Sequence, residues 1–250
     1  MTPAVRCSRR EFLSVALAGT PLAWLPWRKP KEVALAGARF QVVRRKRSHR
    51  RYLVIHGDEE TAREVLTGHM ETHRGIAYLI ETHTRDVAIE GGRLDPNRMF
   101  SRAGAAANLK RLNSAWTADQ LDRALAILDR GRESLLHAFF PPDRGLLIAL
   151  HNNSETYSVN NELELSEQRS LRQPDNPHAF FLCTDPADFR ILATSPYNVV
   201  LQHTVRAPDD GSLSRRAASR NVRYMNLEVR RGDAARQREM LDWAENHLPL

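Results

Sequence analysis

Short apolar runs alternate with longer stretches of helical spacing over most of the chain. Apolar runs of four or five residues, such as 52–55 and 146–150, match buried strands of a sheet that is covered on both faces. The longest helical stretch is 117–139, where leucines recur three or four residues apart after a Thr117–Gln120 capping box. The pattern predicts one α/β domain with a mixed, mostly parallel sheet and helices on both faces. The expected strands are 33–43, 52–55, 76–80, 86–89, 146–150, 180–183, 199–202 and 223–229, the expected helices are 59–72, 117–139, 187–192 and 234–247, and the expected loops include 152–177 and 207–220.

The first 38 residues follow a different pattern. Ser8-Arg9-Arg10-Glu11-Phe12-Leu13 precedes an apolar run over 15–27 and resembles a twin-arginine export signal, whose pattern is S-R-R-x-F-L. The run is shorter than the roughly 20 residues that a stable membrane span needs. We therefore expect residues 1–38 to be signal peptide and linker, and 39–250 to be the folded domain. Cleavage after Ala23, Ala36 or Ala38 fits the sequence equally well.

The signal implies where the protein works. The twin-arginine export machinery would deliver it to the periplasm or the outside of the cell, with no stable membrane span after cleavage. The alternative interpretation of this segment is an amphipathic start to a cytosolic domain. Of the two cysteines, Cys7 would be removed, and Cys183 lies in an apolar strand-like run where a small core residue is expected. Two cysteines exclude a disulfide scaffold and a zinc site of four thiolates.

Composition and charge narrow the classes of function. Of the 250 residues, 42% are apolar and 27% are charged, which is ordinary for a globular protein. The net charge is +7, but residues 39–250 hold 31 basic and 28 acidic residues, a balance too even for a nucleic-acid partner. The basic run 44–51 is expected to be a solvated turn. A patch for anionic polymers at 44–51 is the alternative, and it is the weakest of the functions considered.

Polar side chains follow several of the expected strands. His56 ends one strand and Glu59 opens the next helix, while His151 ends a strand 92 residues further on. In α/β proteins the carboxyl ends of strands form the ligand site. Imidazole nitrogen and carboxylate oxygen are zinc ligands, and three of them leave a fourth position open for water. Between these clusters lies Asp95-Pro96-Asn97-Arg98-Met99-Phe100, whose guanidinium is suited to a carboxylate.

These motifs, in this order, resemble the zinc carboxypeptidase superfamily, which includes the aspartoacylase and succinylglutamate desuccinylase branch. The family pattern is H-G-x-E or H-x-x-E, then D-x-N-R-x-F/W, then x-x-H. Tyr224-Met225-Asn226-Leu227-Glu228-Val229-Arg230 is similar to the strand that carries the family's catalytic glutamate. The resemblance covers about 52–230 and departs from the family at Pro96, where Leu or Ala is common. It implies a catalytic domain of the zinc carboxypeptidase type.

The resemblance also implies roles for individual residues. His56, Glu59 and His151 match the ligands of one zinc ion per chain. Glu228 matches the general base that activates water and protonates the leaving amine. The substrate carboxylate would be held by Asn97 and Arg98, either Arg85 or Arg93 would stabilise the developing oxyanion, and Tyr157 and Tyr224 are candidate site tyrosines.

The expected function is an exported zinc-dependent hydrolase that cleaves an amide bond, peptide or N-acyl, next to a free carboxylate. Its substrates would be peptides or acyl amino acids. The alternative is an exported protein of the same fold that binds carboxylates or peptides without turning them over. A rival metal site would use His69 and His73, which are four residues apart on one helix, together with His83. We expect these three histidines to be surface or core-rim residues instead.

Overall fold

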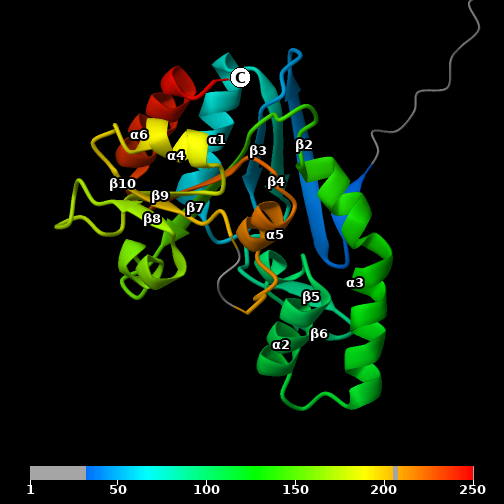
Figure 1. Ribbon diagram of the computed structural model, residues 1–250. Helices are drawn as coiled ribbons and strands as arrows, with labels where there is room; N and C mark the ends of the chain where they lie inside the picture. Colours follow the sequence, from blue (N-terminus) through cyan, green and yellow to red (C-terminus); the bar gives the residue numbers. More distant parts are fainter. Residues whose placement is uncertain (1–31, 205–207, 250) are drawn as a thin grey trace, which may run out of the picture. The chain divides into compact units, whose positions relative to one another are not determined.

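A nine-stranded mixed sheet organises the computed structural model, which describes residues 32–204 and 208–249 (Figure 1). The strands lie in the order β1-β2-β4-β3-β7-β11-β9-β10-β8, with four parallel and four antiparallel pairs. The predicted single α/β domain is confirmed. The strands are β1 Val33–Leu35, β2 Ala38–Arg45, β3 Arg51–Val54, β4 Gly75–Ile80, β7 Leu147–Asn153, β8 Gln168–Ser170, β9 Phe180–Cys183, β10 Asn198–Leu201 and β11 Tyr224–Arg230.

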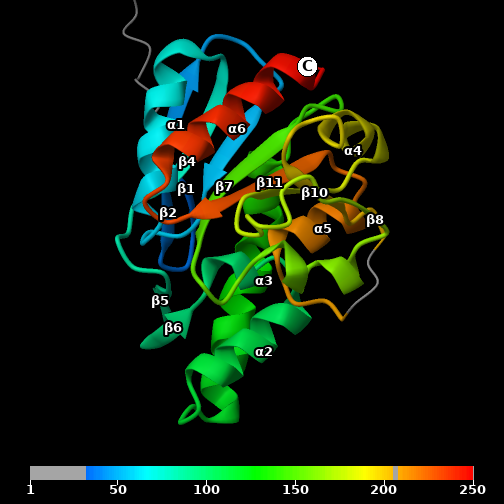
Figure 2. The same ribbon diagram turned by 90° about the vertical axis from the view of Figure 1, so that its left-hand side faces the viewer.

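Helices cover both faces of this sheet, as predicted (Figures 1 and 2). Each face has its own apolar core, because side chains of the central strands point alternately to either side. In β3, for example, Leu53 belongs to one core while Tyr52 and Val54 belong to the other. The first face is covered by α2 Arg102–Leu112, α3 Ala118–Phe139 and α5 Leu213–Ser219, and the second by α1 Glu60–Thr72, α4 Pro186–Leu192 and α6 Ala234–His247.

Two of the predicted strands are corrected by the structure. Residues 33–43 form an antiparallel hairpin, β1 with β2, rather than one strand, because Ala36 has a positive φ of 51° and turns the chain. The strand predicted at 86–89 is β5 Val87–Ile89, which pairs only with β6 Gly92–Leu94 in a separate two-stranded sheet.

Other predictions differ from the structure in the less regular parts of the chain. Helix α2 was not predicted, and the expected loop 207–220 contains α5. The expected loop 152–177 contains β8 and two short 3-10 turns. The basic run 44–51 is not a purely solvated turn. Arg50 within it is buried, donates to the Leu248 carbonyl at 2.7 Å and pairs with Glu245 at 3.1 Å.

The sheet brings the carboxyl ends of four strands to one edge. β4, β3, β7 and β11 are consecutive in the sheet and mutually parallel. This arrangement places the residues that follow β3 beside the ends of β7 and β11. Of the predicted signal and linker, 1–38, residues 1–31 lie outside the described residues, whereas 33–38 form part of the β1–β2 hairpin. No helix in 32–204 or 208–249 combines the length and apolar character that a membrane crossing requires.

Candidate metal centre

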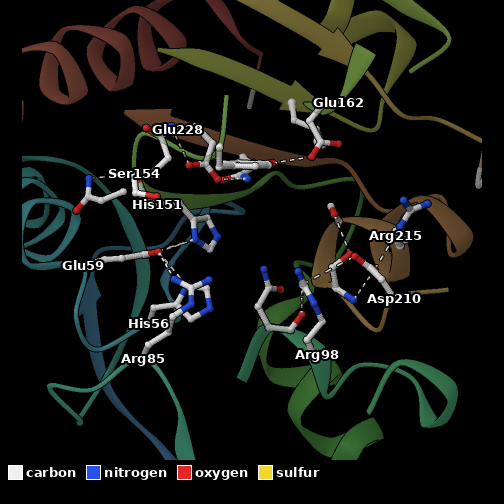
Figure 3. Close-up of a pocket in the computed structure, with 18 of the residues that line it drawn as sticks. His56, Glu59, Arg85, Arg98, His151, Ser154, Glu162, Asp210, Arg215 and Glu228 are labelled. Atoms are coloured by element: carbon white, nitrogen blue, oxygen red, sulfur yellow. Dashed lines mark hydrogen bonds and ion pairs between the residues drawn. The ribbon is translucent and has the colours of Figure 1, made fainter. Parts of the chain in front are cut away.

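Three buried side chains converge at this edge of the sheet: His56, Glu59 and His151 (Figure 3). His56 Nδ1 lies 2.9 Å from Glu59 Oε1, and His151 Nδ1 lies 3.2 Å from Glu59 Oε2. Tetrahedral ligands about 2.0–2.2 Å from a zinc ion are separated by roughly 3.3–3.6 Å. The spacing is therefore already close to that of a metal-ligand set, and the group could bind a metal ion.

The local sequence explains how His56 and Glu59 reach one point. His56 follows the end of β3, and Glu59 is the residue before the first turn of α1. The connection between them requires glycine at position 57, because a Cβ there would collide with the carbonyl oxygen of Thr82. His151 comes from within β7, which continues two residues beyond it. The strand end predicted at His151 is thus extended, since β7 pairs with β11 along its whole length.

Asp95 completes the site and was not predicted to act there. Its Oδ1 lies 2.9 Å from His56 Nε2, the ring nitrogen that faces away from Glu59. A carboxylate at Nε2 fixes the proton on that nitrogen and leaves Nδ1 to a metal, as is usual for histidine ligands. The hydrogen bond to His56 and the charges of His56 and Arg85 lower the pKa of Asp95, although burial opposes this. The residue belongs to the Asp95-Pro96-Asn97-Arg98 motif, so the signal was present in the sequence.

The charges of the group fit a divalent cation. Burial works against ionisation of Glu59, but the adjacent histidines lower its pKa to about 2. Burial likewise opposes the charged form of His56, and Glu59 together with Asp95 nevertheless raises its pKa to about 9. Glu59 Oε2 is buried and has no hydrogen-bond partner among the described residues. An anionic oxygen in this position, beside two imidazoles, is the donor set that zinc prefers, and zinc would displace the proton from Nδ1 of His56.

Glu228 lies next to His151 on the same sheet face. The two residues are paired in the parallel register of β11 and β7, so their side chains point to the same side. The carboxylate is buried and accepts hydrogen bonds from Asn226 Nδ2 at 3.0 Å and Asn153 Nδ2 at 3.3 Å. Burial raises the pKa of Glu228, with a further contribution from the charge of Glu59. A buried carboxyl with a raised pKa is suited to accept and return a proton.

The structure distinguishes the two candidate arginines. Arg85 lines the pocket at the metal group, with nitrogens 3.7 Å from Glu59 and 3.8 Å from Asp95. Arg93 does not line the pocket, and its side chain is paired with Asp86 at 3.6 Å. Of these two arginines, only Arg85 therefore lies beside the His56-Glu59-His151 group.

Arg98 lies across the pocket from the metal group (Figure 3). Its Nη1 is 3.9 Å from Asp210, which also pairs with Nε of Arg215 at 3.2 Å. Arg215 was not among the predicted site residues because it belongs to α5, where a loop was expected. Two guanidinium groups share one carboxylate here, an arrangement that can also bind an anionic group of a ligand.

Asn97 holds the start of α5 in place, whereas its neighbour Arg98 pairs with Asp210. Its Oδ1 accepts a hydrogen bond from the backbone N–H of Leu213 at 3.0 Å, which ties the start of α5 to the motif. Gly211 packs against the carbonyl of Arg98 so closely that a Cβ would collide with it. Asn97 thus fixes the loop that carries Asp210 beside Arg98.

Both candidate tyrosines line the pocket. The hydroxyl of Tyr157 donates to Glu162 at 2.7 Å, and Tyr224 is buried on β11 two positions before Asn226. Burial, with the charge of Glu228, raises the pKa of both phenols. They are therefore neutral hydrogen-bonding groups near the site.

No known protein family, curated protein or solved structure matches this chain. The fold and the site define its class directly: a mixed α/β domain with a buried His-Glu-His group that could hold a metal ion. The group opens into a pocket of about 740 Å³ that also holds Glu228, Arg85 and Arg98.

Replacing Asp95 by Asn is expected to lower zinc affinity by about 10–100-fold, because the amide no longer polarises His56. Competition with a chromophoric chelator measures this affinity. Asp86→Asn is the matched control, since Asp86 pairs with Arg93 outside the pocket and should leave zinc binding unchanged. Equal affinities in the two variants would contradict the role given to Asp95.

Proposed function

We propose that this protein is an exported zinc-dependent hydrolase that cleaves an amide bond next to a free carboxylate. The observation that carries the proposal is the pairing of Glu228 with His151 across β11 and β7. It puts a buried carboxyl with a raised pKa beside a metal-ligand group, with Arg98 in the same pocket. The motif order that resembles the zinc carboxypeptidase superfamily supports the same reaction, and the Arg9-Arg10 motif supports export.

Each residue of the site has a separate role in the proposed reaction. A zinc ion held by His56, Glu59 and His151 would polarise the scissile carbonyl and make water more acidic. Glu228 takes the proton of the attacking water and returns it to the leaving amine. Arg85 faces the carbonyl oxygen as negative charge develops on it. Proton transfer by Glu228 is possible because Asn226 and Asn153 hold its two oxygens in a fixed orientation.

Substrate binding rests on Arg98. Arg98 and Arg215 together exceed the charge of Asp210, so the far side of the pocket attracts a carboxylate. Asn97 positions this region through its bond to Leu213. We propose peptides with a free C-terminus, including cell-wall stem peptides, or N-acyl amino acids as substrates. Export favours the peptides.

A paired-substrate assay tests this function. Zinc-loaded protein should hydrolyse peptides or acyl amino acids that end in a free carboxylate and leave the corresponding carboxamides intact. Arg98→Met should lower kcat/KM by roughly 10–100-fold, because a charge-assisted contact is lost. Arg93→Met is the control, since Arg93 does not line the pocket. Equal cleavage of acid and carboxamide, or equal effects of the two substitutions, would contradict the proposal.

A further inference from the structure

A second cluster of metal-ligating side chains lies on the opposite sheet face from the pocket. We propose that His69, His73 and Asp242 bind a divalent transition-metal ion, such as zinc, that links the end of α1 to α6. The cluster is about 15 Å along α1 from Glu59, given the rise of the helix. It is therefore separate from the first centre and does not depend on the proposed hydrolase activity.

The placement of the three ligands follows from helix packing. His69 lies in the last turn of α1, and His73 is the C-cap residue directly after it, so the four-residue spacing leaves both histidines on one side of the helix end. Helix α6 packs against α1 on the same sheet face and contributes Asp242. One nitrogen of each histidine and one carboxylate oxygen of Asp242 lie within 4.8 Å of one another. His83, the third member of the predicted rival site, does not belong to this group.

Each histidine has one nitrogen already directed at a partner other than a metal. His69 is buried, and its Nε2 faces Glu245 Oε1 at 3.8 Å without forming a hydrogen bond. Glu245 is held there by the hydroxyl of Tyr52 at 2.9 Å and by Arg50 at 3.1 Å. Glu245 thus lies on the Nε2 side of His69, at a longer distance than Asp95 from His56, and Nδ1 is the other nitrogen that His69 can offer to an ion.

His73 is oriented by the end of the helix. Its Nδ1 lies 3.2 Å from the carbonyl oxygen of His69 and 2.9 Å from Thr72 Oγ1. A proton on Nδ1 satisfies that carbonyl and leaves the lone pair on Nε2. The site therefore offers one nitrogen from each of two imidazoles and one carboxylate, the same donor types as the first centre, with exposed Asp242 leaving room for water.

The His73 ring must rotate before the three ligands can converge on one ion. The rings of His69 and His73 stack face to face, with centroids 3.8 Å apart and planes within 5°. Lone pairs of parallel rings do not converge, so the half-buried His73 must rotate as the ion binds and exchange the contacts of its Nδ1 with Thr72 and the His69 carbonyl for the contact with the ion. His69 keeps its place, because Tyr52 and Glu245 enclose it. An ion bound in this way cross-links two helices of one core and stabilises the folded state.

Zinc titration of the His151→Ala variant tests the site, because this substitution removes a ligand of the first centre. We expect His151→Ala to bind one zinc per chain by calorimetry and His151→Ala/His73→Ala to bind none. His151→Ala/His83→Ala is the matched control and should bind like His151→Ala. At zinc about 100-fold above its Kd, the Tm of His151→Ala should rise by about 5–10 °C, and the rise should disappear with His73→Ala.

The wild-type background provides a second measurement that does not require His151→Ala to fold. There, His73→Ala or Asp242→Asn should reduce saturating zinc from two ions per chain to one. Because His73 and Asp242 are not fully buried, neither substitution disturbs a core. Zinc stoichiometry that is the same with and without His73 and Asp242 would overturn the proposal in either background.

Discussion

Replacing Glu228 by Gln is expected to lower kcat by about 10²–10⁴-fold while bound zinc stays at the wild-type level. Glutamine has the shape of glutamate and its amide oxygen can still accept one of the two hydrogen bonds from Asn226 and Asn153, but it cannot take up a proton. Its side chain is not one of the three candidate metal ligands. Steady-state kinetics on a substrate with a free carboxylate, together with metal analysis of the same sample, measures both effects.

The control for this substitution is Glu133→Gln, which changes an exposed glutamate paired with Arg220 on the surface. It should retain wild-type kcat. Wild-type kcat in Glu228→Gln would contradict the role of Glu228 as the proton acceptor. A wild-type protein that binds zinc and carboxylates without turning them over would instead establish the alternative, a non-catalytic binding protein.

Replacing Asp188 by Asn is expected to lower the free energy of unfolding by about 3–5 kcal/mol, because it leaves the buried charge of Arg223 without its partner. Arg223 donates from Nε and Nη2 to the two oxygens of Asp188 at 3.0 and 2.7 Å, and both residues are buried. Arg223 immediately precedes β11, the strand that carries Glu228. The ion pair therefore anchors a strand of the site, and urea unfolding measures its contribution.

An exposed ion pair supplies the comparison for Asp188→Asn. Arg230 and Glu155 form two contacts, at 2.6 and 3.0 Å, but both side chains are largely solvated. Glu155→Gln should change the free energy of unfolding by less than about 1 kcal/mol. Similar losses in Asp188→Asn and Glu155→Gln would show that burial does not govern the strength of these pairs.

Several regular elements could be predicted because buried strands appear in the sequence as continuous apolar runs and helix starts as capping motifs. The central strands β3, β7 and β9 are largely buried, and each therefore contains an unbroken apolar run, 52–54 in β3, 147–150 in β7 and 180–183 in β9. The capping box at Thr117 and Gln120 marks the start of α3 and is present in the structure. Helix α5 has no such signal in its sequence. It has seven residues and no side-chain cap from Ser212, and its first turn is instead fixed by Asn97 from far away in the sequence.

The candidate site, too, could be predicted only as far as it does not depend on contacts between elements that are distant in the sequence. His56, Glu59 and His151 could be grouped because strand ends of a parallel sheet meet at one edge, and the structure brings them together. Partners that depend on packing between distant elements could not be grouped. Asp242, for example, joins His69 only because α6 lies on α1, and the sequence suggested His83 instead.

The most direct test of the metal centre is the zinc content of His73→Ala compared with His73→Ala/His151→Ala. The His73→Ala background removes the second cluster from the count, so any zinc reports on His56, Glu59 and His151. We predict about one zinc per chain in His73→Ala and none in His73→Ala/His151→Ala. Folded His73→Ala protein without zinc, or equal zinc in both variants, would contradict the assignment of this centre.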